Sequence, residues 1–472
     1  MEKTLNTAAP AKTLTAEEEK LAFAPIGKVL AAYAIPGVLS MVVNSLYNIV
    51  DQIFIGNIVG YLGNGATNVV FPMSIAIMAI AMLFGNGGAA YFSLRLGEQR
   101  YEHAKRCVVS STIAVAVVSI IMAILMFTFI EPICRLFGCT DQILPYAKEY
   151  GSITLFGMPM VAVIMVLNGF IRADGSPKRA MAAMLCGCIL NIILDPIFML
   201  VFDMGISGAA VATVISQFTG FVITLTYLNK FKTIKIGKAD IKVDFRVLGK
   251  SCSLGTSSFV SQIAMIFLMG LMNNSYVKYG ALSPYGSDIP LTAVGITSKI
   301  SQIVFSVANG ISGGSQPIIG YNYGAGNIER VKKTYLTATG ICVVIMVIGT
   351  VFLEIFTQPV INLFGSESEL YNEFAVKSVR IFMSVLVFNG IQASIVVFFQ
   401  AIGKPMRSLL LSSLRQIVLL LPSILILPHL FEDGLTGLMF ASPVADSIAF
   451  IVSITFFVYQ WKKLGKEKEL RA

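Results

Sequence analysis

The segment EPICRLFG at residues 131–138 returns 227 residues later as QPVINLFG at residues 358–365. The same shift aligns further landmarks of the chain, namely Gly97 with Gly324, Glu102 with Glu329, and Lys105 with Lys332. Landmarks that recur in one order over such a distance are the signature of an internal repeat. The chain therefore consists of two related halves.

Each half contains six apolar runs that are long enough to cross a bilayer. Hydrophobic residues make up 56% of the 472 residues and charged residues only 13%, about half the charged share of a soluble domain. A hydrocarbon core about 30 Å thick requires roughly 20 apolar residues in each helix. The runs lie at 31–55, 66–92, 107–130, 150–171, 180–202 and 207–228, and at 252–277, 291–318, 334–357, 378–401, 407–429 and 436–460. The predicted fold class is an all-α polytopic membrane protein with twelve transmembrane helices.

The two six-helix halves are predicted to enter the membrane in the same sense. Because each half has an even number of spans, they form parallel repeats about an axis along the membrane normal, packed around a central cavity. Of the 35 Lys and Arg residues, 28 fall in the two tails or in the loops on one side. By the positive-inside rule that side is cytoplasmic. We therefore expect a multi-pass protein of the bacterial plasma membrane with both termini in the cytoplasm.

The predicted domains follow from these spans. They are a polar cytoplasmic N-terminal tail (1–27), an N-lobe (28–228), a basic cytoplasmic linker (229–250), a C-lobe (251–460) and a basic cytoplasmic tail (461–472). The mixed charge of residues 140–150 and 366–377 predicts a short interfacial helix on the outer side of each lobe.

Composition also excludes several classes of function. The net charge of +9 follows from the basic loops of a membrane protein, so no nucleic-acid partner is expected. Seven Cys without a CxxC pair and only two His offer no metal or haem site, and the redox state of Cys134 and Cys139 stays open. The glycine-rich strings at 85–88 and 310–314 lack the GK[ST] of a phosphate loop, which favours close helix packing. We expect neither an enzyme nor a cofactor, and an ion gradient as the energy source.

Polar residues interrupt the first span on one helical face, at spacings i, i+3, i+4 and i+7: Asn44, Tyr47, Asn48 and Asp51. Lipid cannot be what this face meets. In the fifth span Asn191 and Asp195 share a face, and a rise of about 1.5 Å per residue places Asp195 at the depth of Thr213 in the sixth span. We therefore expect the three spans to bring Asp51, Asp195 and Thr213 together in the outer half of the membrane.

A carboxyl group inside the membrane is a candidate proton or ion site, because an unpaired charge at that depth is costly. Asp51 and Asp195 are therefore predicted to couple transport to an ion. Their predicted supporting partners are Tyr47, Asn191 and Thr213. The alternative is that Asp195 caps the backbone broken by Pro196 and that Asp51 ends the first span at the outer interface.

The C-lobe also contains charged residues near the middle of its spans, namely Lys299, Arg415 and Asp446. One basic residue is expected to neutralise Asp446, and Lys299 is favoured over Arg415. A structural role is favoured for this pair, because buried ion pairs more often fix packing than perform transport. The alternative is a role in coupling or substrate contact.

A substrate pocket is predicted from one face of the seventh span and one face of the tenth. Methionine and aromatic linings adapt to ligands of many shapes, although methionine stripes also occur in ordinary helix packing. The residues concerned are Gln262, Met265, Met269, Phe388, Asn389 and Gln392.

Over residues 28–460 the chain resembles the multidrug and toxic compound extrusion (MATE) family. Pro36 followed by YNIVD at 47–51 resembles the family's bent first helix and its carboxylate, and NIILDP at 191–196 with Thr213 resembles the second acidic motif. The likeness is to the prokaryotic branch named for DNA-damage-inducible pumps, and overall to staphylococcal-type multidrug pumps. The sodium-pump branch instead carries acids in the seventh and tenth spans, where this chain has Gln262, Asn389 and Gln392.

The resemblance implies a secondary antiporter that exports amphipathic, often cationic, drugs and toxic compounds. The favoured coupling ion is H⁺, and Na⁺ is the alternative. The resemblance also implies a hinge at Pro36, where the helix lacks a backbone hydrogen bond. The expected protein is a monomer whose partners are cationic drugs and membrane lipids. The alternative is a lipid-linked oligosaccharide flippase of the same superfamily, but such flippases carry several cations in the central cavity, and here only Lys299 and Arg415 are candidates.

Overall fold

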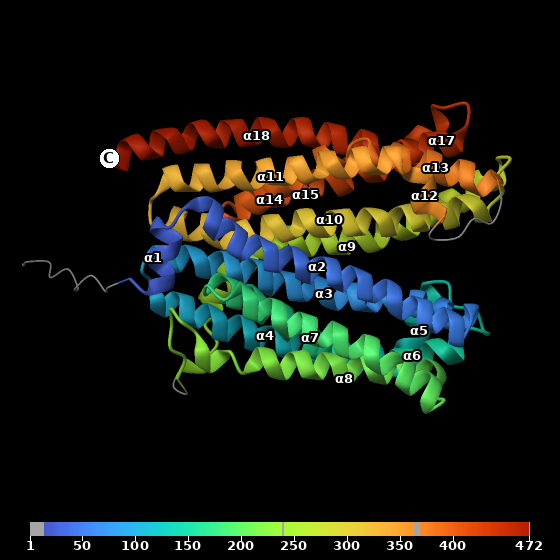
Figure 1. Cartoon of the computed structure of the whole chain (residues 1–472), viewed down its shortest axis with the longest axis horizontal. Helices are drawn as coiled ribbons and strands as arrows, with labels where there is room; N and C mark the ends of the chain where they lie inside the picture. The colour runs from blue at the N-terminus through green and yellow to red at the C-terminus, as the bar shows by residue number, and fades with distance from the viewer. Residues whose placement is uncertain (1–13, 238–239, 363–368, 472) are drawn as a thin grey trace, which may run out of the picture.

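The computed structural model describes residues 14–237, 240–362 and 369–471, and over these residues the chain is helical with no strand. Figure 1 shows the helices lying side by side in one elongated bundle. A short helix, α1 (Ala16–Phe23), precedes the spans. It lies at the same end of the bundle as the C-terminus (Figure 1). We call this the basal end and the opposite end, where the second helix finishes, the distal end.

The six predicted spans of the N-lobe are all confirmed. They are α2 (Ile26–Ile58), α3 (Tyr61–Gly97), α4 (Tyr101–Thr128), α6 (Leu144–Ala173), α7 (Pro177–Pro196), continued by the π-helix η1 (Ile197–Val201), and α8 (Gly205–Leu225).

The C-lobe has the six matching spans, and three of them contain breaks. They are α9 (Phe245–Ala281), α10 (Asp288–Gly324), α11 (Ile328–Ile355), α13 (Glu369–Met383) with α14 (Leu386–Ala401), α15 (Pro405–Ser413) with the π-helix η4 (Leu414–Leu420) and α16 (Leu421–Ile426), and α17 (Gly434–Met439) with α18 (Ala441–Arg471). Helices α13 and α14 together make one span that bends by 42°. Counted in this way, the described chain has twelve spans.

The repeated sequence itself forms the short helices at the distal end, which corrects the prediction for residues 140–150 and 366–377. In the structure α5 (Ile130–Leu136) and α12 (Thr357–Asn362) are the short helices. Residues from Leu144 onward already belong to α6, which has a proline in its first turn where its missing N–H costs nothing. Residues from Glu369 onward belong to α13, and residues 366–368 lie outside the described residues.

The basic linker is shorter than the sequence suggested. Helix α9 begins at Phe245, inside the predicted linker 229–250. The Asp244 side chain accepts hydrogen bonds from the backbone N–H groups of Arg246 and Val247. An aspartate in this position satisfies donors that would otherwise be unpaired at a helix start, and it therefore fixes where the C-lobe begins.

Glycines bring the backbones of the two lobes into contact in the basal half of the bundle. A Cβ atom on Gly97 of α3 would lie 1.9 Å from the carbonyl oxygen of Tyr321 on α10, and one on Gly87 would lie 2.2 Å from that of Ser251 on α9. Any larger residue would therefore push the helices apart. Helix packing is confirmed as the role of the glycine string at 85–88.

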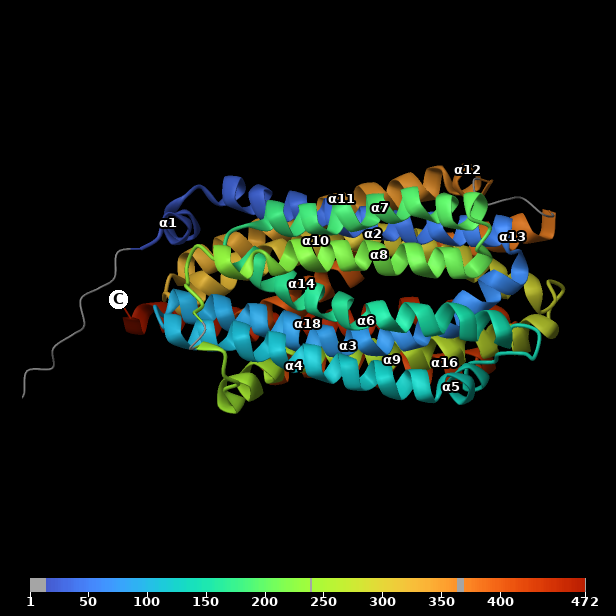
Figure 2. The ribbon, with the colours of Figure 1, turned by 90° about the horizontal axis from the view of Figure 1, so that it is seen from below.

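The two lobes separate toward the distal end. The face of α9 that carries Ser251 and Gly255 packs on α3. Further along the same face, Met265 and Met269 are 47% and 42% exposed. Figure 1 shows the N-lobe and the C-lobe as the blue-to-green and the yellow-to-red halves of the bundle, and Figure 2 shows the bundle from below. The interlobe contacts are therefore tight basally and leave polarizable side chains uncovered distally.

Candidate functional site

Two carboxyl groups meet in the distal half of the N-lobe. Asp51 lies near the distal end of α2, and Asp195 lies near the end of α7, just before Pro196 and the π-helix η1. The two side chains are within hydrogen-bonding distance of each other, and Asp195 is fully buried. Single π-helical turns inside helices frequently mark functional sites. The fold thus joins two acids that are far apart in the sequence.

Asn191 and Thr213 complete the polar side of Asp195. The Asn191 amide donates from Nδ2 to Oδ1 of Asp195 at 2.9 Å and to Oγ1 of Thr213 at 3.3 Å. Asn191 is one helical turn before Asp195, while Thr213 comes from α8, so the amide ties two helices together. The structure therefore places together four of the residues that the sequence singled out.

Two tyrosines stand beside the acids. Tyr47, one turn before Asp51 on α2, and Tyr150 of α6 both lie close enough to interact electrostatically with Asp51 and Asp195. Tyr150 is absent from the residues predicted from sequence, although it stands at the distal start of its helix, at the depth of Asp195. In contrast, Asn48 is exposed, and its amide bonds back to the Asn44 carbonyl at 2.6 Å.

The site has hydrogen-bond acceptors but no fixed cation. Oδ1 of Asp51, Oδ2 of Asp195 and Oδ1 of Asn191 are buried without a hydrogen-bond partner. Among the described residues, no Lys, Arg or His forms an ion pair with either acid. Buried acceptors of this kind are costly unless a donor arrives. A proton or a small cation is the donor or counter-charge that such a group of oxygens can take.

An apolar layer closes the site toward the distal end. Ile55, Met199 and Ala209 form a separate hydrophobic cluster, and all three are almost fully buried. Each lies four residues, or about one helical turn, from one of the site residues Asp51, Asp195 and Thr213. We call these three residues the apolar roof. It separates the acids from the distal surface along the axes of α2, α7 and α8.

Comparison with known proteins decides the family. The MatE family profile matches residues 36–197 and 263–426, which is more than half of the chain. The chain belongs to the MatE family. The multidrug export protein MepA of Staphylococcus aureus (strain MSSA476) is 26% identical over 435 residues, covering 91% of this chain and 93% of that protein. MepA of Staphylococcus haemolyticus (strain JCSC1435) is 26% identical over 436 residues, covering 92% and 93%.

Solved MATE structures share the whole fold of this MatE-family chain. The outward-facing conformation of a multidrug resistance MATE family transporter of the MOP superfamily superposes with a TM-score of 0.88 at 25% identity, covering 96% of this chain and 100% of that chain. A MATE structure in the bent conformation gives a TM-score of 0.87 at 25% identity, covering 97% and 100%. The protein is therefore a multi-pass membrane protein with the twelve-helix MATE fold, from a family of multidrug exporters.

In this MatE protein the buried acid of the C-lobe pairs with Arg415, and the prediction of Lys299 as its partner is wrong. Nε of Arg415 donates to Oδ1 of Asp446 at 2.5 Å, and Nδ2 of Asn389 donates to Oδ2 at 3.0 Å. Lys299 lies instead on the face of α10 that also carries Ser306, which contacts Ser45 of the N-lobe at 2.7 Å. The rotation of α10 thus directs Lys299 toward the other lobe.

The six residues of the predicted pocket divide between two places. Met265 and Met269, with Gln262, lie on the interlobe face of α9. Phe388, Asn389 and Gln392 lie within the C-lobe, where Phe388 stacks on Phe450 with ring centroids 4.5 Å apart. Nε2 of Gln392 donates to the Leu411 carbonyl at 3.4 Å. Only the α9 group therefore faces the separation between the lobes.

The predicted hinge residue, Pro36, lies buried inside α2, which runs without a break from Ile26 to Ile58. The Ser40 hydroxyl donates to the Pro36 carbonyl at 2.7 Å. Proline leaves α2 one backbone hydrogen bond short at this level. The helix is thus continuous here, and Pro36 lies within the contact of α2 with α10, next to the close approach of Gly37 and Gly310.

Proposed function

We propose that this MatE-family protein is a proton-driven antiporter that exports amphipathic, cationic drugs from the cytoplasm across the bacterial plasma membrane. The observation that carries the proposal is the contact between the Asp51 and Asp195 carboxyl groups. Two such groups can hold a proton between them. Because they lack a fixed counter-cation, they can also give the proton up and take it back.

The orientation follows from the charge of the loops. The basal end carries the basic linker and the basic tail, and Lys and Arg concentrate on the cytoplasmic side of membrane proteins. Both termini are then cytoplasmic. The distal separation between the lobes then opens outward, which is the arrangement that receives protons and releases drug.

The proposed substrate class follows from the interlobe face of α9. Met265 and Met269 present flexible, polarizable side chains that adapt to different apolar shapes, and Gln262 adds an amide that accepts or donates a hydrogen bond. A cationic drug reaching this face from the cytoplasm or from membrane lipid would find a mostly apolar surface. The transporter acts as a monomer, because one chain supplies both lobes and the whole site.

Coupling requires that the protonated and deprotonated forms differ in conformation. A ligand shifts an equilibrium only by its difference in affinity for the two states. The acids are on α2 and α7, and α2 also forms part of the interlobe contact. A change in the contact between Asp51 and Asp195 can therefore alter how α2 packs on α10. Pro36, where α2 lacks a backbone hydrogen bond, is the point at which α2 would bend.

The test is uptake of a fluorescent organic cation into everted membrane vesicles under an imposed pH gradient or an imposed Na⁺ gradient. We expect a pH gradient, acidic inside, to drive uptake, and an equal Na⁺ gradient to drive none. Uptake driven by Na⁺ alone would replace the proton as the coupling ion. Absence of uptake with both gradients, together with movement of a lipid-linked oligosaccharide, would replace the antiporter by a flippase.

A further inference from the structure

Helix α1 is a short helix with a defined start. The Thr15 hydroxyl and backbone N–H are both 2.8 Å from Oε2 of Glu18, and the Glu18 N–H is 3.4 Å from the Thr15 hydroxyl. This reciprocal capping box fixes the first turn of a helix. Leu21 and Glu18 are almost completely buried. Although only eight residues long, α1 is therefore docked against the bundle.

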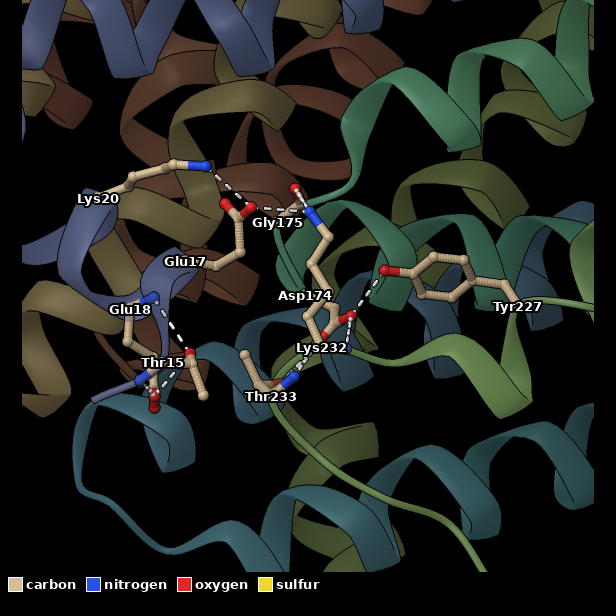
Figure 3. A network of polar contacts seen from close by, with 9 residues as sticks. All are labelled: Thr15, Glu17, Glu18, Lys20, Asp174, Gly175, Tyr227, Lys232 and Thr233. Carbon is tan, nitrogen blue, oxygen red and sulfur yellow. Dashed lines mark hydrogen bonds and ion pairs between the residues drawn. The ribbon is translucent and has the colours of Figure 1, made fainter. Parts of the chain in front are cut away.

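The first turn of α1 binds the N-lobe through two of its three acids, Glu17 and Glu18. The Tyr101 hydroxyl of α4 donates to Oε1 of Glu18 at 2.8 Å. Nζ of Lys232 lies 2.7 Å from Oε1 of Glu17 and also donates to the Gly175 carbonyl at 3.2 Å (Figure 3). Acids in the first turn are well placed because the N-terminal end of a helix carries partial positive charge.

Lys232 is itself fixed to the N-lobe by Asp174. Oδ2 of Asp174 accepts from the Tyr227 hydroxyl and from the Lys232 N–H, each at 2.7 Å. Oδ1 accepts from the Thr233 N–H at 3.0 Å and from the Thr233 hydroxyl at 2.5 Å (Figure 3). The start of the linker therefore moves with the N-lobe, and so does the lysine that holds Glu17.

The last turn of α1 binds the C-lobe through its carbonyl groups. Nε of Arg330 donates to the Leu21 carbonyl at 2.7 Å, and its Nη2 donates to the Ala24 carbonyl at 2.5 Å. Nδ2 of Asn322 donates to the Leu21 carbonyl at 3.0 Å. The final carbonyls of a helix have no partner within the helix and carry partial negative charge. An arginine is a matching partner for them.

We propose that α1 is a strap that holds the basal ends of the two lobes together, and that it must release the C-lobe each time the basal side opens. Arg330 and Asn322 belong to α11 and α10, whereas Tyr101 and Lys232 are fixed to the N-lobe. The strap lies beside the contact of Gly97 with Tyr321, which closes the same end of the bundle. The strap therefore adds hydrogen bonds to the basal interface between the lobes, where the backbones of α3 and α10 pack closely.

The covalent link between α1 and α2 determines which lobe α1 releases. Ala24 and Pro25 alone separate α1 from α2, so α1 cannot move far from the N-lobe. Its bonds to Arg330 and Asn322 have no such covalent support. The inference depends on the proposed function only in that a transporter must open at its basal end.

Hydrogen–deuterium exchange of the intact protein in detergent tests the strap without drug or ion gradient. We expect Arg330→Ala to speed exchange by about tenfold in α1, because bonds from a charged donor are worth this much or more. We also expect faster exchange at the basal ends of α3 and α10, residues 90–97 and 318–324. The matched control is Lys333→Ala, because the ion pair that Lys333 forms among the described residues is with Glu329 on its own helix. This variant should change exchange in neither place.

Faster exchange in α1 alone, with the ends of α3 and α10 as slow as in the wild type, would overturn the strap and leave α1 as a docked tail. If Arg330→Ala also speeds exchange in the interior of the N-lobe, Asn322→Ala decides the question, because it removes a single donor to the Leu21 carbonyl. Asn322→Ala should give the same pattern with a smaller change. The exchange rates do not depend on which ion drives transport, so the strap proposal can fail while the proposed function stands.

Discussion

Arg415 of η4 pairs with Asp446 of α18, so the buried acid of the C-lobe carries its own cation. In the last span of each half the repeat has drifted to a shift of 229 residues, as Gly208 and Gly437 show, so Ser442, which is hydrogen-bonded to Asp446, aligns with Thr213 of the N-lobe. No basic residue of the described chain pairs with either acid of the N-lobe. The C-lobe therefore holds a fixed ion pair at the level where the N-lobe holds two acids with unpaired oxygens. We expect ion exchange in the N-lobe and a constant charge state in the C-lobe.

Removing one partner of the C-lobe pair should destabilise the protein. We expect Arg415→Met and Asp446→Leu each to lower the free energy of unfolding by about 3 kcal/mol, because each leaves a buried charge unpaired. The double variant should recover much of this loss. Thermal unfolding in detergent measures the cycle, with Lys299→Met as a control of small effect. Additive losses in the double variant would show that the two side chains do not depend on each other.

Asp195→Asn should abolish ion-driven export while the protein stays folded. The new amide has the volume of the carboxyl group, and its oxygen can still accept the hydrogen bond from Asn191 once the amide rotates. The amide cannot release a proton, however. Vesicle uptake of a fluorescent cation is the measurement. Asp203→Asn, at an exposed distal turn, is the matched control and should transport normally. Transport by Asp195→Asn at the wild-type rate would remove Asp195 from the coupling site.

Asp51→Asn should slow transport less than Asp195→Asn does. The new amide can donate to Asp195, which keeps its hydrogen bond from Asn191. The same vesicle assay, run across a range of imposed pH gradients, should show a residual proton-driven rate for Asp51→Asn. A greater loss in this variant would make Asp51 the principal proton carrier.

Pro36→Ala should restore the missing hydrogen bond of α2, stiffen the helix and lower turnover with little change in drug affinity. Spin labels on Ile53 of α2 and Val117 of α4, both exposed, can report the distance between the helices at pH 5 and pH 8. The exposed Cys186 must first be replaced. The wild-type distance should depend on pH and the Pro36→Ala distance should not. No pH effect in the wild type would reject the hinge.

The contact of Glu17 with Lys232 should make the docking of α1 sensitive to acid. Burial raises the pKa of Glu17, but Lys232 and Lys20 outweigh it, and the net pKa lies below the ordinary value of 4.5. A lowered pKa means that the stabilisation is fully present above pH 4.5 and is lost as the pH falls through the folded value. The difference in melting temperature between wild type and Glu17→Gln should therefore shrink below pH 4.5. Glu19→Gln, on the exposed side of α1, should show no such difference at any pH.

The sequence predicts the spans well because each needs a long apolar run, and it predicts the depth of a polar residue from the constant rise of a helix. That is sufficient for Asp51, Asp195, Asn191 and Thr213. It does not predict how far a helix is rotated about its axis, so Lys299 and Arg415, at similar depths, could not be told apart. Tyr150 was missed because tyrosines are common where spans meet the interface. The bend between α13 and α14 and the two π-helices depend on packing between distant segments.

The apolar roof of Ile55, Met199 and Ala209 has a consequence for how efficiently a gradient is used. A carrier that let protons pass straight from the outer surface to the acids and on to the cytoplasm would dissipate the gradient without exporting anything. In the proposed antiporter, we expect this apolar layer, one helical turn from the acids, to prevent a continuous file of water along α2, α7 and α8. A proton could then reach and leave the acids only when the lobes change conformation. If the proposed proton coupling holds, economical use of the ion gradient would thus depend on three side chains that lie outside the group of acids.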